Sequence, residues 1–303
     1  MKSVIETHDL CKSYHGRPVV DHLNLTVPQG CVYGFLGPNG AGKSTTMKML
    51  LGLVHPTGGS VELLGHTLNE SSRIALLRQT GSLIESPSGY LHLTARENLA
   101  IVADLKEVER RDIDRVLDIV HLTKDADRKV GQYSLGMKQR LGIAMALLGS
   151  PKLLILDEPT NGLDPAGIQE MRSLIAAMPQ TTGATVLISS HLLGEIEQMV
   201  DQVGILNHGK LLFLLVRDNE LPRLGQDGQI LIPPFAVFFV VLASLGKGHQ
   251  MPDAPADQIP ATLPIAVLLF SGPDHGGNAA GYAGLFGNYQ LNAHVSSSCP
   301  FSE

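Results

Sequence analysis

The residues best suited to chemistry lie in one glycine-rich stretch, which reads Gly-Pro-Asn-Gly-Ala-Gly-Lys-Ser-Thr over positions 37–45. This spacing is typical of a loop that holds phosphate groups. Its glycines leave backbone N–H groups free to point at phosphate oxygens, and a helix beginning near Lys43 would direct its positive end toward them. We expect Lys43 to reach the β- and γ-phosphates of a nucleotide and the Ser44 hydroxyl to hold Mg²⁺. The residues expected to bind are Gly37, Pro38, Asn39, Gly40, Ala41, Gly42, Lys43, Ser44 and Thr45.

Two acids follow a second apolar run. Asp157 and Glu158 come directly after residues 151–156, which contain no charge beyond Lys152. A strand that is apolar on both faces belongs in the middle of a parallel sheet, and ligands bind at the carboxyl ends of such strands. Alone, the two acids would fit a solvated strand end equally well. Beside a phosphate loop they predict a Mg²⁺ site that Asp157 shares with Ser44, because the ion prefers oxygen ligands.

Two single side chains extend the candidate site. His191 follows another apolar run, residues 185–189, and could contact a γ-phosphate at the same sheet edge. A lone histidine is more often structural or simply exposed. Tyr14 lies in a polar turn, where its ring could stack on an adenine base. On residue type alone, an ordinary half-buried turn tyrosine is the commoner case.

The elements that must position these residues are indicated by changes of hydrophobic period. Alternation of apolar and polar residues predicts half-exposed strands over 4–10 and 23–27. Three-and-four spacing predicts helices between 94 and 149, the first beginning with a capping box at Thr94 and Glu97. The pattern therefore predicts an α/β fold with a mixed, largely parallel central sheet, an antiparallel β edge and a helical subdomain at about residues 86–149.

Bulk composition excludes several classes of protein. A net charge of -6 with 17% charged residues offers no basic face, so nucleic-acid binding is not expected. The three cysteines lie far apart and show neither a disulfide framework nor metal-ligand spacing, which suits a reducing cytoplasm. The N-terminus does not read as a signal peptide. The longest apolar run, residues 230–245, is shorter than the ~20 residues of a spanning helix and contains two prolines.

In this order, the segments resemble the ATP-binding subunit of an ABC transporter over about residues 3–213. Residues 133–140, Tyr-Ser-Leu-Gly-Met-Lys-Gln-Arg, occupy the position of the family's signature, and residues 156–165 are similar to its Walker B strand and D-loop. The signature departs from the general Leu-Ser-Gly-Gly-Gln, and Glu85 stands where most members have glutamine. Both departures are similar to the branch that handles bacitracin and lantibiotic peptides.

The resemblance implies a P-loop NTPase that works as a head-to-tail homodimer closed on two ATP molecules. The phosphate loop of one copy would hold the triphosphate, while Ser134 and Gly136 of the other copy would contact the γ-phosphate. Small residues are needed there because a helix N-terminus must approach closely. Asp164 would link the two sites across the dimer.

The resemblance also implies catalytic roles. Asp157 would support Mg²⁺, Glu158 would orient and polarise the attacking water, and His191 would steady the γ-phosphate, with positioning and charge neutralisation carrying the rate. Glu85 lies at the joint with the helical subdomain, where the ATP state could be relayed to polytopic membrane permease subunits.

The function that we expect is an ATPase subunit, peripheral on the cytoplasmic face of the membrane, that energises export of, or immunity to, peptide antibiotics or drugs. Two alternatives stay open. One is a subunit that binds ATP but turns it over slowly, as the altered signature suggests. The other is a soluble ABC ATPase acting on ribosomes or DNA, against which the charge and the single ATP-binding domain argue.

Composition changes abruptly after about residue 213. We expect a nucleotide-binding domain over residues 1–215 and an atypical, low-charge tail rich in proline and glycine over residues 216–303. The tail sustains no helical or strand period. It is either a disordered or partly folded extension, or the product of a frameshift that replaced the native ending.

Overall fold

The computed structural model describes residues 2–85, 89–196 and 198–217, with the short segments 223–224, 230–231 and 238–242. The chain divides into two units, Met1–Leu212 and Phe213–Glu303. In the second, the part of β11 (Lys210–Arg217) from Phe213 on pairs with β14 (Phe238–Leu242), and β12 (Arg223–Leu224) pairs with β13 (Ile230–Leu231). Most of the expected tail, and most of the apolar run over 230–245, lies outside the described residues.

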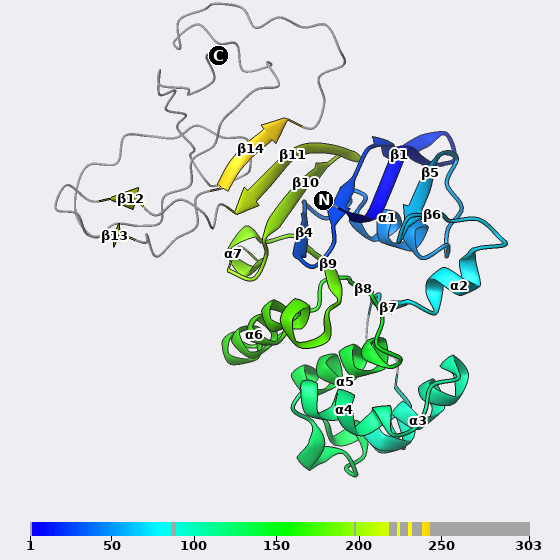
Figure 1. Ribbon diagram of the computed structural model, residues 1–303, viewed down its shortest axis with the longest axis vertical. Coiled ribbons are helices and arrows are strands. Elements are labelled where there is room, and N and C mark those ends of the chain that lie inside the picture. Colours follow the sequence, from blue (N-terminus) through cyan, green and yellow to red (C-terminus); the bar gives the residue numbers. More distant parts are fainter. Residues whose placement is uncertain are drawn as a thin grey trace, which may run out of the picture. The chain divides into compact units, whose positions relative to one another are not determined.

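The first unit begins with an antiparallel sheet, in which β1 pairs with β2, β3 and β5 (Figure 1). Alternation in the sequence predicted strands over 4–10 and 23–27: the first lies within β1, whereas the second coincides with strands only at its ends, Leu23 in β2 and residues 26–27 in β3. The strand β2 was not anticipated, because its pairing with β1 defines it. The strands are β1 (Ser3–Tyr14), β2 (Arg17–Leu23), β3 (Thr26–Pro28), β5 (Gly58–Leu63) and β6 (His66–Thr67).

The central sheet has the strand order β10-β4-β9-β8-β7, in which every neighbouring pair is parallel. Every residue of β4, β8 and β9 is buried, as expected for strands covered on both faces. Their carboxyl ends therefore meet at one edge. The strands are β4 (Val32–Leu36), β7 (Thr80–Leu83), β8 (Leu153–Leu156), β9 (Thr185–Ser190) and β10 (Gln202–Asn207).

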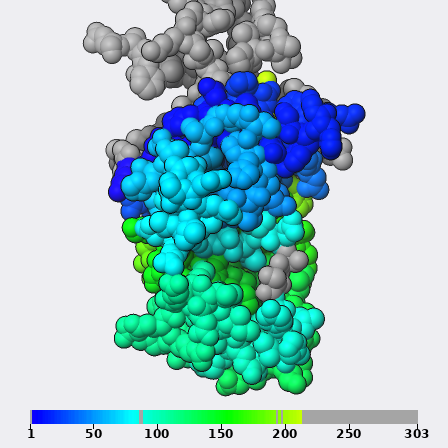
Figure 2. All heavy atoms as spheres, turned by 90° about the vertical axis from the view of Figure 1, so that its right-hand side faces the viewer, coloured from blue at the N-terminus to red at the C-terminus, as the bar shows by residue number. Residues whose placement is uncertain are grey.

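Four helices accompany the strands, and the others form the expected helical subdomain, seen as a separate group of residues in Figure 2. Contacts of α6 with β4 and β9 place this helix against the central sheet. Beside the strands are α1 (Lys43–Leu50), α2 (Arg73–Leu77), α6 (Pro165–Thr182) and α7 (Leu193–Ile196). The subdomain comprises α3 (Ala95–Lys106), α4 (Asp112–Ile119), η1 (Thr123–Asp125), η2 (Val130–Gln132) and α5 (Leu135–Leu147).

Polar contacts at helix ends hold the subdomain together. The predicted capping box of Thr94 and Glu97 is confirmed at the start of α3. At the other end, the Lys106 ammonium donates to the carbonyls of Met145, Ala146 and Leu148, which the last turn of α5 leaves without intrahelical partners. Burial lowers the pKa of Lys106. Within the described residues, no helix has the length and apolar character needed to cross a membrane.

Candidate functional site

The glycine-rich loop joins the end of β4 to the start of α1. A Cβ atom on Gly37 would lie 2.3 Å from the Leu206 carbonyl oxygen, so only glycine fits against β10. Gly42 has a φ of 104°, and a Cβ atom there would lie 2.6 Å from the Val19 carbonyl oxygen. The loop therefore packs closely against the backbone of Leu206 and Val19, and α1 begins directly after it. This is the geometry by which a helix N-terminus and free backbone N–H groups hold phosphate.

The Lys43 ammonium lies inside the loop. Its Nζ donates to the carbonyl oxygens of Gly37 at 2.6 Å and Pro38 at 3.2 Å, and only 6% of the side chain is exposed. These hydrogen bonds fix the buried ammonium beside the loop backbone, where it could also form a charge-assisted hydrogen bond with a phosphate.

The two acids after β8 are held by one hydroxyl. Ser189 Oγ, at the end of the neighbouring β9, donates to Asp157 Oδ1 at 2.5 Å and accepts from the Glu158 N–H at 2.9 Å. Asp157 is buried, with 5% exposure. Within the part of the chain that the structure describes, no hydrogen bond reaches its second carboxylate oxygen.

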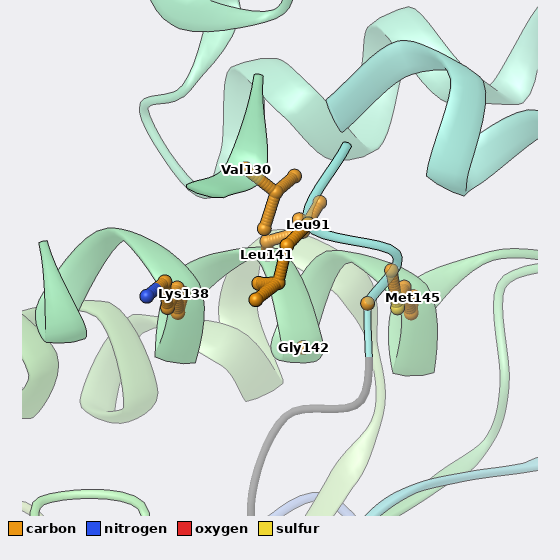
Figure 3. A pocket seen from close by; sticks show the side chains of 7 residues that line it. Leu91, Val130, Lys138, Leu141, Gly142 and Met145 are labelled. Carbon is orange, nitrogen blue, oxygen red and sulfur yellow. The ribbon is translucent and has the colours of Figure 1, made fainter. Parts of the chain in front are cut away.

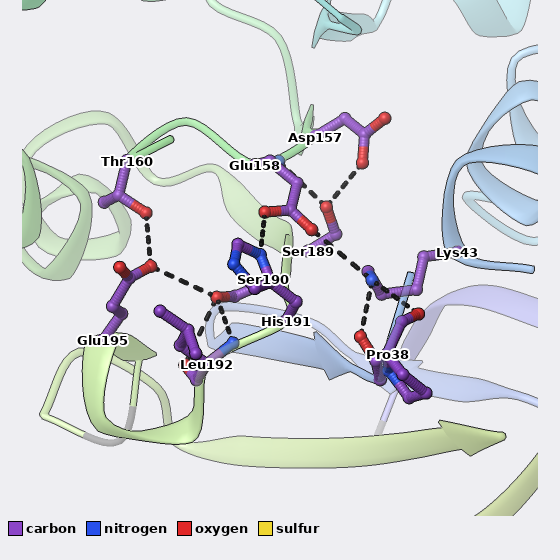
Figure 4. Close-up of polar contacts among 11 residues, drawn as sticks. Pro38, Lys43, Asp157, Glu158, Thr160, Ser189, Ser190, His191, Leu192 and Glu195 are labelled. Carbon is purple, nitrogen blue, oxygen red and sulfur yellow. Dashed lines mark hydrogen bonds and ion pairs between the residues drawn. The ribbon is translucent and has the colours of Figure 1, made fainter. Parts of the chain in front are cut away.

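Glu158 lies between Lys43 and His191 (Figure 4). Its backbone has a φ of 49°, an unusual left-handed conformation for a residue with a side chain. One carboxylate oxygen is 3.4 Å from Lys43 Nζ, and the other is 2.6 Å from His191 Nδ1. The structure therefore brings together, at one sheet edge, the loop lysine, the second acid and the histidine that the sequence singled out.

Glu85 is joined to the helix after the phosphate loop. It follows β7, has a φ of 66°, and accepts a hydrogen bond of 2.7 Å from Lys48 Nζ in α1. The Lys48 ammonium lowers the pKa of Glu85. The pKa of Lys48 is raised, chiefly by the hydrogen bond to Glu85, with a smaller contribution from the charge of Asp157.

The remaining expected residues lie elsewhere. Ser134 and Asp164 are the N-caps of α5 and α6, where their side chains accept from the N–H groups of Met137 and Gly167. Gly136 lies in the first turn of α5, and the nearest atom to a Cβ built there is 3.8 Å away. Among the described residues, no hydrogen bond joins this group to the phosphate loop.

Tyr14 lies at the end of β1 and is 44% exposed. The Lys12 ammonium lies 4.9 Å from the centre of its ring, within the range of a cation–π contact. One ring face is thus occupied by a cation. Stacking of Tyr14 on adenine stays a prediction.

Sequence reasoning missed four polar residues around the two acids. Ser189 and Ser190 end β9, Thr160 follows Glu158, and Glu195 lies in α7. The pair of serines at the end of an apolar run was the only local signal, because the partners of Ser189 and Thr160 lie 31 to 35 positions away in the chain.

The helical subdomain carries a small hollow of its own (Figure 3). It lies between α5 and the segment that leads into α3. Tyr90 and Leu91 in that segment are both 57% exposed, so apolar surface meets solvent at its rim. The hollow is lined by Gly89, Leu91, Val130, Lys138, Leu141, Gly142 and Met145.

The chain is similar to known proteins over most of the first unit. A family model described as "ABC transporter" matches residues 20–161. The bacitracin transport ATP-binding protein BcrA of Bacillus licheniformis is 54% identical over 213 residues, which cover 70% of this chain and 69% of that protein. The lantibiotic transport ATP-binding protein SrtF of Streptococcus pyogenes is 46% identical, covering 69% of this chain and 89% of that protein.

Solved structures give the same result for the fold. The cbiO1 protein of Clostridium perfringens, described as part of the ABC transporter complex cbiONQ, has a TM-score of 0.66 at 25% identity, covering 71% of this chain and 88% of that one. An ATP-binding subunit of another ABC transporter has a TM-score of 0.62 at 30% identity, covering 70% and 90%.

Proposed function

The chain belongs to the ABC transporter family of ATP-binding proteins, and we propose that it hydrolyses ATP to drive export of, or immunity to, peptide antibiotics through separate membrane subunits. The observation that carries this proposal is the row formed by Lys43, Glu158 and His191. The peptide substrate class is inferred from the similarity of the chain to bacitracin and lantibiotic transport proteins. Glu85 and the altered signature over residues 133–140, which resemble that branch, support the same class.

Each residue of the row has a role in phosphoryl transfer. We propose that Lys43 and the glycine-rich loop hold the β- and γ-phosphates, and that Glu158 orients and polarises the attacking water. His191, in contact with the Glu158 carboxylate, would steady the γ-phosphate. Such a reaction depends on positioning and charge neutralisation more than on covalent chemistry.

The residues present fit a magnesium ion. The hydroxyl of Ser44 and the free carboxylate oxygen of Asp157 are oxygen ligands, the kind that Mg²⁺ prefers. When bound, the ion would neutralise charge on the phosphate oxygens.

We propose a second copy of the chain as the partner that completes the site. Ser134, Gly136 and Asp164 lie at the N-termini of α5 and α6, have no hydrogen bond to the loop of their own chain among the described residues, and would face the nucleotide of the other copy. A polytopic permease would be the other partner, holding this subunit at the cytoplasmic face of the membrane. The exposed Leu91, which lines the hollow in Figure 3, and its exposed neighbour in the chain, Tyr90, support a contact surface there.

We also propose that the nucleotide-binding domain ends near residue 215. The division of the chain into units at Leu212 and Phe213 supports this boundary. The frameshift hypothesis for the remainder is tested by resequencing the gene: an unbroken frame together with a detected peptide from the tail would end it.

ATP turnover by the purified full chain tests the proposal. We expect the wild type to release phosphate from ATP, and Glu158→Gln to be slower by about 10²- to 10⁴-fold, the usual contribution of a general base. Glu107→Gln removes the same charge at an exposed position beside Arg78 and should match the wild type. A wild type no faster than Glu158→Gln would favour the alternative, a nucleotide-binding subunit with little turnover.

A further inference from the structure

The Glu195 carboxylate connects the two segments that carry Glu158 and His191. Glu195 Oε2 accepts a hydrogen bond of 2.9 Å from Thr160 Oγ1 and lies 3.4 Å from Ser190 Oγ (Figure 4). Thr160 and Ser190 are buried, with 2% and 1% exposure. Ser190 Oγ also accepts from the Leu192 N–H at 3.1 Å and lies 3.3 Å from the Leu192 carbonyl, whereas Glu195 is the side-chain partner of Thr160 among the described residues. A buried hydroxyl that loses its partner is costly, so the carboxylate holds Thr160 in position and links it to Ser190.

The two hydroxyls are close in sequence to the catalytic side chains. Thr160 is two residues after Glu158, in the loop that follows β8, and Ser190 immediately precedes His191 at the end of β9. One oxygen atom of Glu195 therefore spans the two segments whose side chains meet at 2.6 Å in the contact between Glu158 and His191.

The backbone around Glu195 is anchored independently of its carboxylate. Arg172, in α6, donates from Nε to the Glu195 carbonyl at 2.7 Å and from Nη2 to the Gly194 carbonyl at 2.5 Å. Removing the Glu195 side chain should leave this turn attached to α6. The bridge between Thr160 and Ser190 can therefore be tested apart from the fold of the turn.

We propose that Glu195 is a positioning residue, which fixes His191 against Glu158 by bridging Thr160 and Ser190. The inference rests on the proposed ATPase function and deepens it. Glu195 makes no contact with Lys43 or the phosphate loop among the described residues, so it should affect turnover of bound ATP more than ATP binding. A purely structural residue would lower both or neither.

Steady-state ATP hydrolysis by full-length Glu195→Ala, Glu195→Gln and wild type distinguishes a positioning role of Glu195 from a purely structural one. Glu109→Ala is the control, because Glu109 is an exposed glutamate paired with Arg111 between α3 and α4. We expect Glu195→Ala to lower kcat by about 10- to 100-fold, the scale of a misplaced catalytic group. Its KM for ATP should stay within about threefold of the wild type, since interactions made only in the transition state act on kcat.

The glutamine variant tests the bridge itself. Its amide oxygen can still accept from Thr160, so Glu195→Gln should recover most of the kcat, whereas Glu109→Ala should behave as the wild type. Equal kcat for Glu195→Ala and wild type would overturn the proposal. So would equal losses in both Glu195 variants accompanied by a lower melting temperature, because these would indicate a structural role.

Thr160→Val supplies a second, independent variant. If Glu195 acts through Thr160, the double variant Thr160→Val with Glu195→Ala should be little slower than the slower single variant. Fully additive losses would contradict the bridge. If the wild type hydrolyses ATP and Glu195→Ala hydrolyses it equally fast, the positioning role alone is refuted. If the wild type does not hydrolyse ATP, the proposed function and this inference are refuted together.

Discussion

Glu158 and His191 are in direct contact, 2.6 Å apart between carboxylate and imidazole, although they lie 33 residues apart and end different strands. The contact exists because β8 and β9 are parallel neighbours whose carboxyl ends meet at one edge. The other oxygen of the same carboxylate faces Lys43. The Glu158 side chain thus connects the lysine of the glycine-rich loop with the histidine that follows β9.

Lys43→Ala should weaken ATP binding. Hydrogen bonds to charged groups contribute about 1.5–3 kcal/mol, so removal of the ammonium should raise the Kd for ATP by roughly 10- to 100-fold. Titration calorimetry with ATP measures the change. Lys124→Ala, which removes an exposed lysine in η1, is the control and should bind as the wild type. Unchanged binding by Lys43→Ala would show that the loop does not hold the nucleotide.

Ser189→Ala should impair both stability and turnover. The variant leaves the buried Asp157 carboxylate and the Glu158 N–H without the hydroxyl that joins them. We expect the free energy of unfolding to fall by about 1–3 kcal/mol, the cost of unsatisfied buried polar groups. Urea denaturation measures it, and Ser173→Ala on the exposed side of α6 is the matched control. Equal stability of the two variants would contradict the role given to Ser189.

The ion pair of Lys48 and Glu85 should make stability depend on pH. Because Lys48 lowers the pKa of Glu85, the contribution of the pair is fully present above the ordinary pKa of a glutamate. It is lost as the pH falls through the lowered, folded-state pKa. Denaturant titrations should therefore show Lys48→Met less stable than the wild type at about pH 7, with the difference shrinking as the pH falls below the ordinary pKa of a glutamate.

High salt should reduce the same difference at neutral pH, because both side chains are partly exposed and the interaction is screened. The exposed ion pair of Arg78 and Glu107, which also joins two different elements, serves as the control for this salt dependence. A stability difference for Lys48→Met that does not change with pH would mean that packing of the lysine stem, and not its charge, is what the variant loses.

The parts of the site that the sequence predicted are those with a local pattern. The glycine spacing of residues 37–45 places the loop, and the apolar run before Asp157 places the acids at a strand end. The capping box at Thr94 was predicted for the same reason. Ser189 and Glu195 were missed because their contacts join segments more than 30 residues apart, so no period or spacing indicates them. The strand β2 was missed because it is defined by pairing with β1.

The roles of Ser134, Gly136 and Asp164 depend on a second copy of the chain, which local spacing does not describe. Ser134 and Asp164 cap helices in their own chain, and Gly136 lies in the first turn of α5. Their roles in binding therefore stay predictions that a measurement of assembly has to test.

The most direct test of the shared site is the molecular mass of Glu158→Gln in solution, by size exclusion with light scattering, with and without ATP. Because this variant should bind ATP but cleave it slowly, we predict a monomer without nucleotide and a dimer with ATP, and no dimer when Lys43→Ala is added. A Glu158→Gln chain that stays monomeric at saturating ATP would contradict the claim that two copies close on the nucleotide.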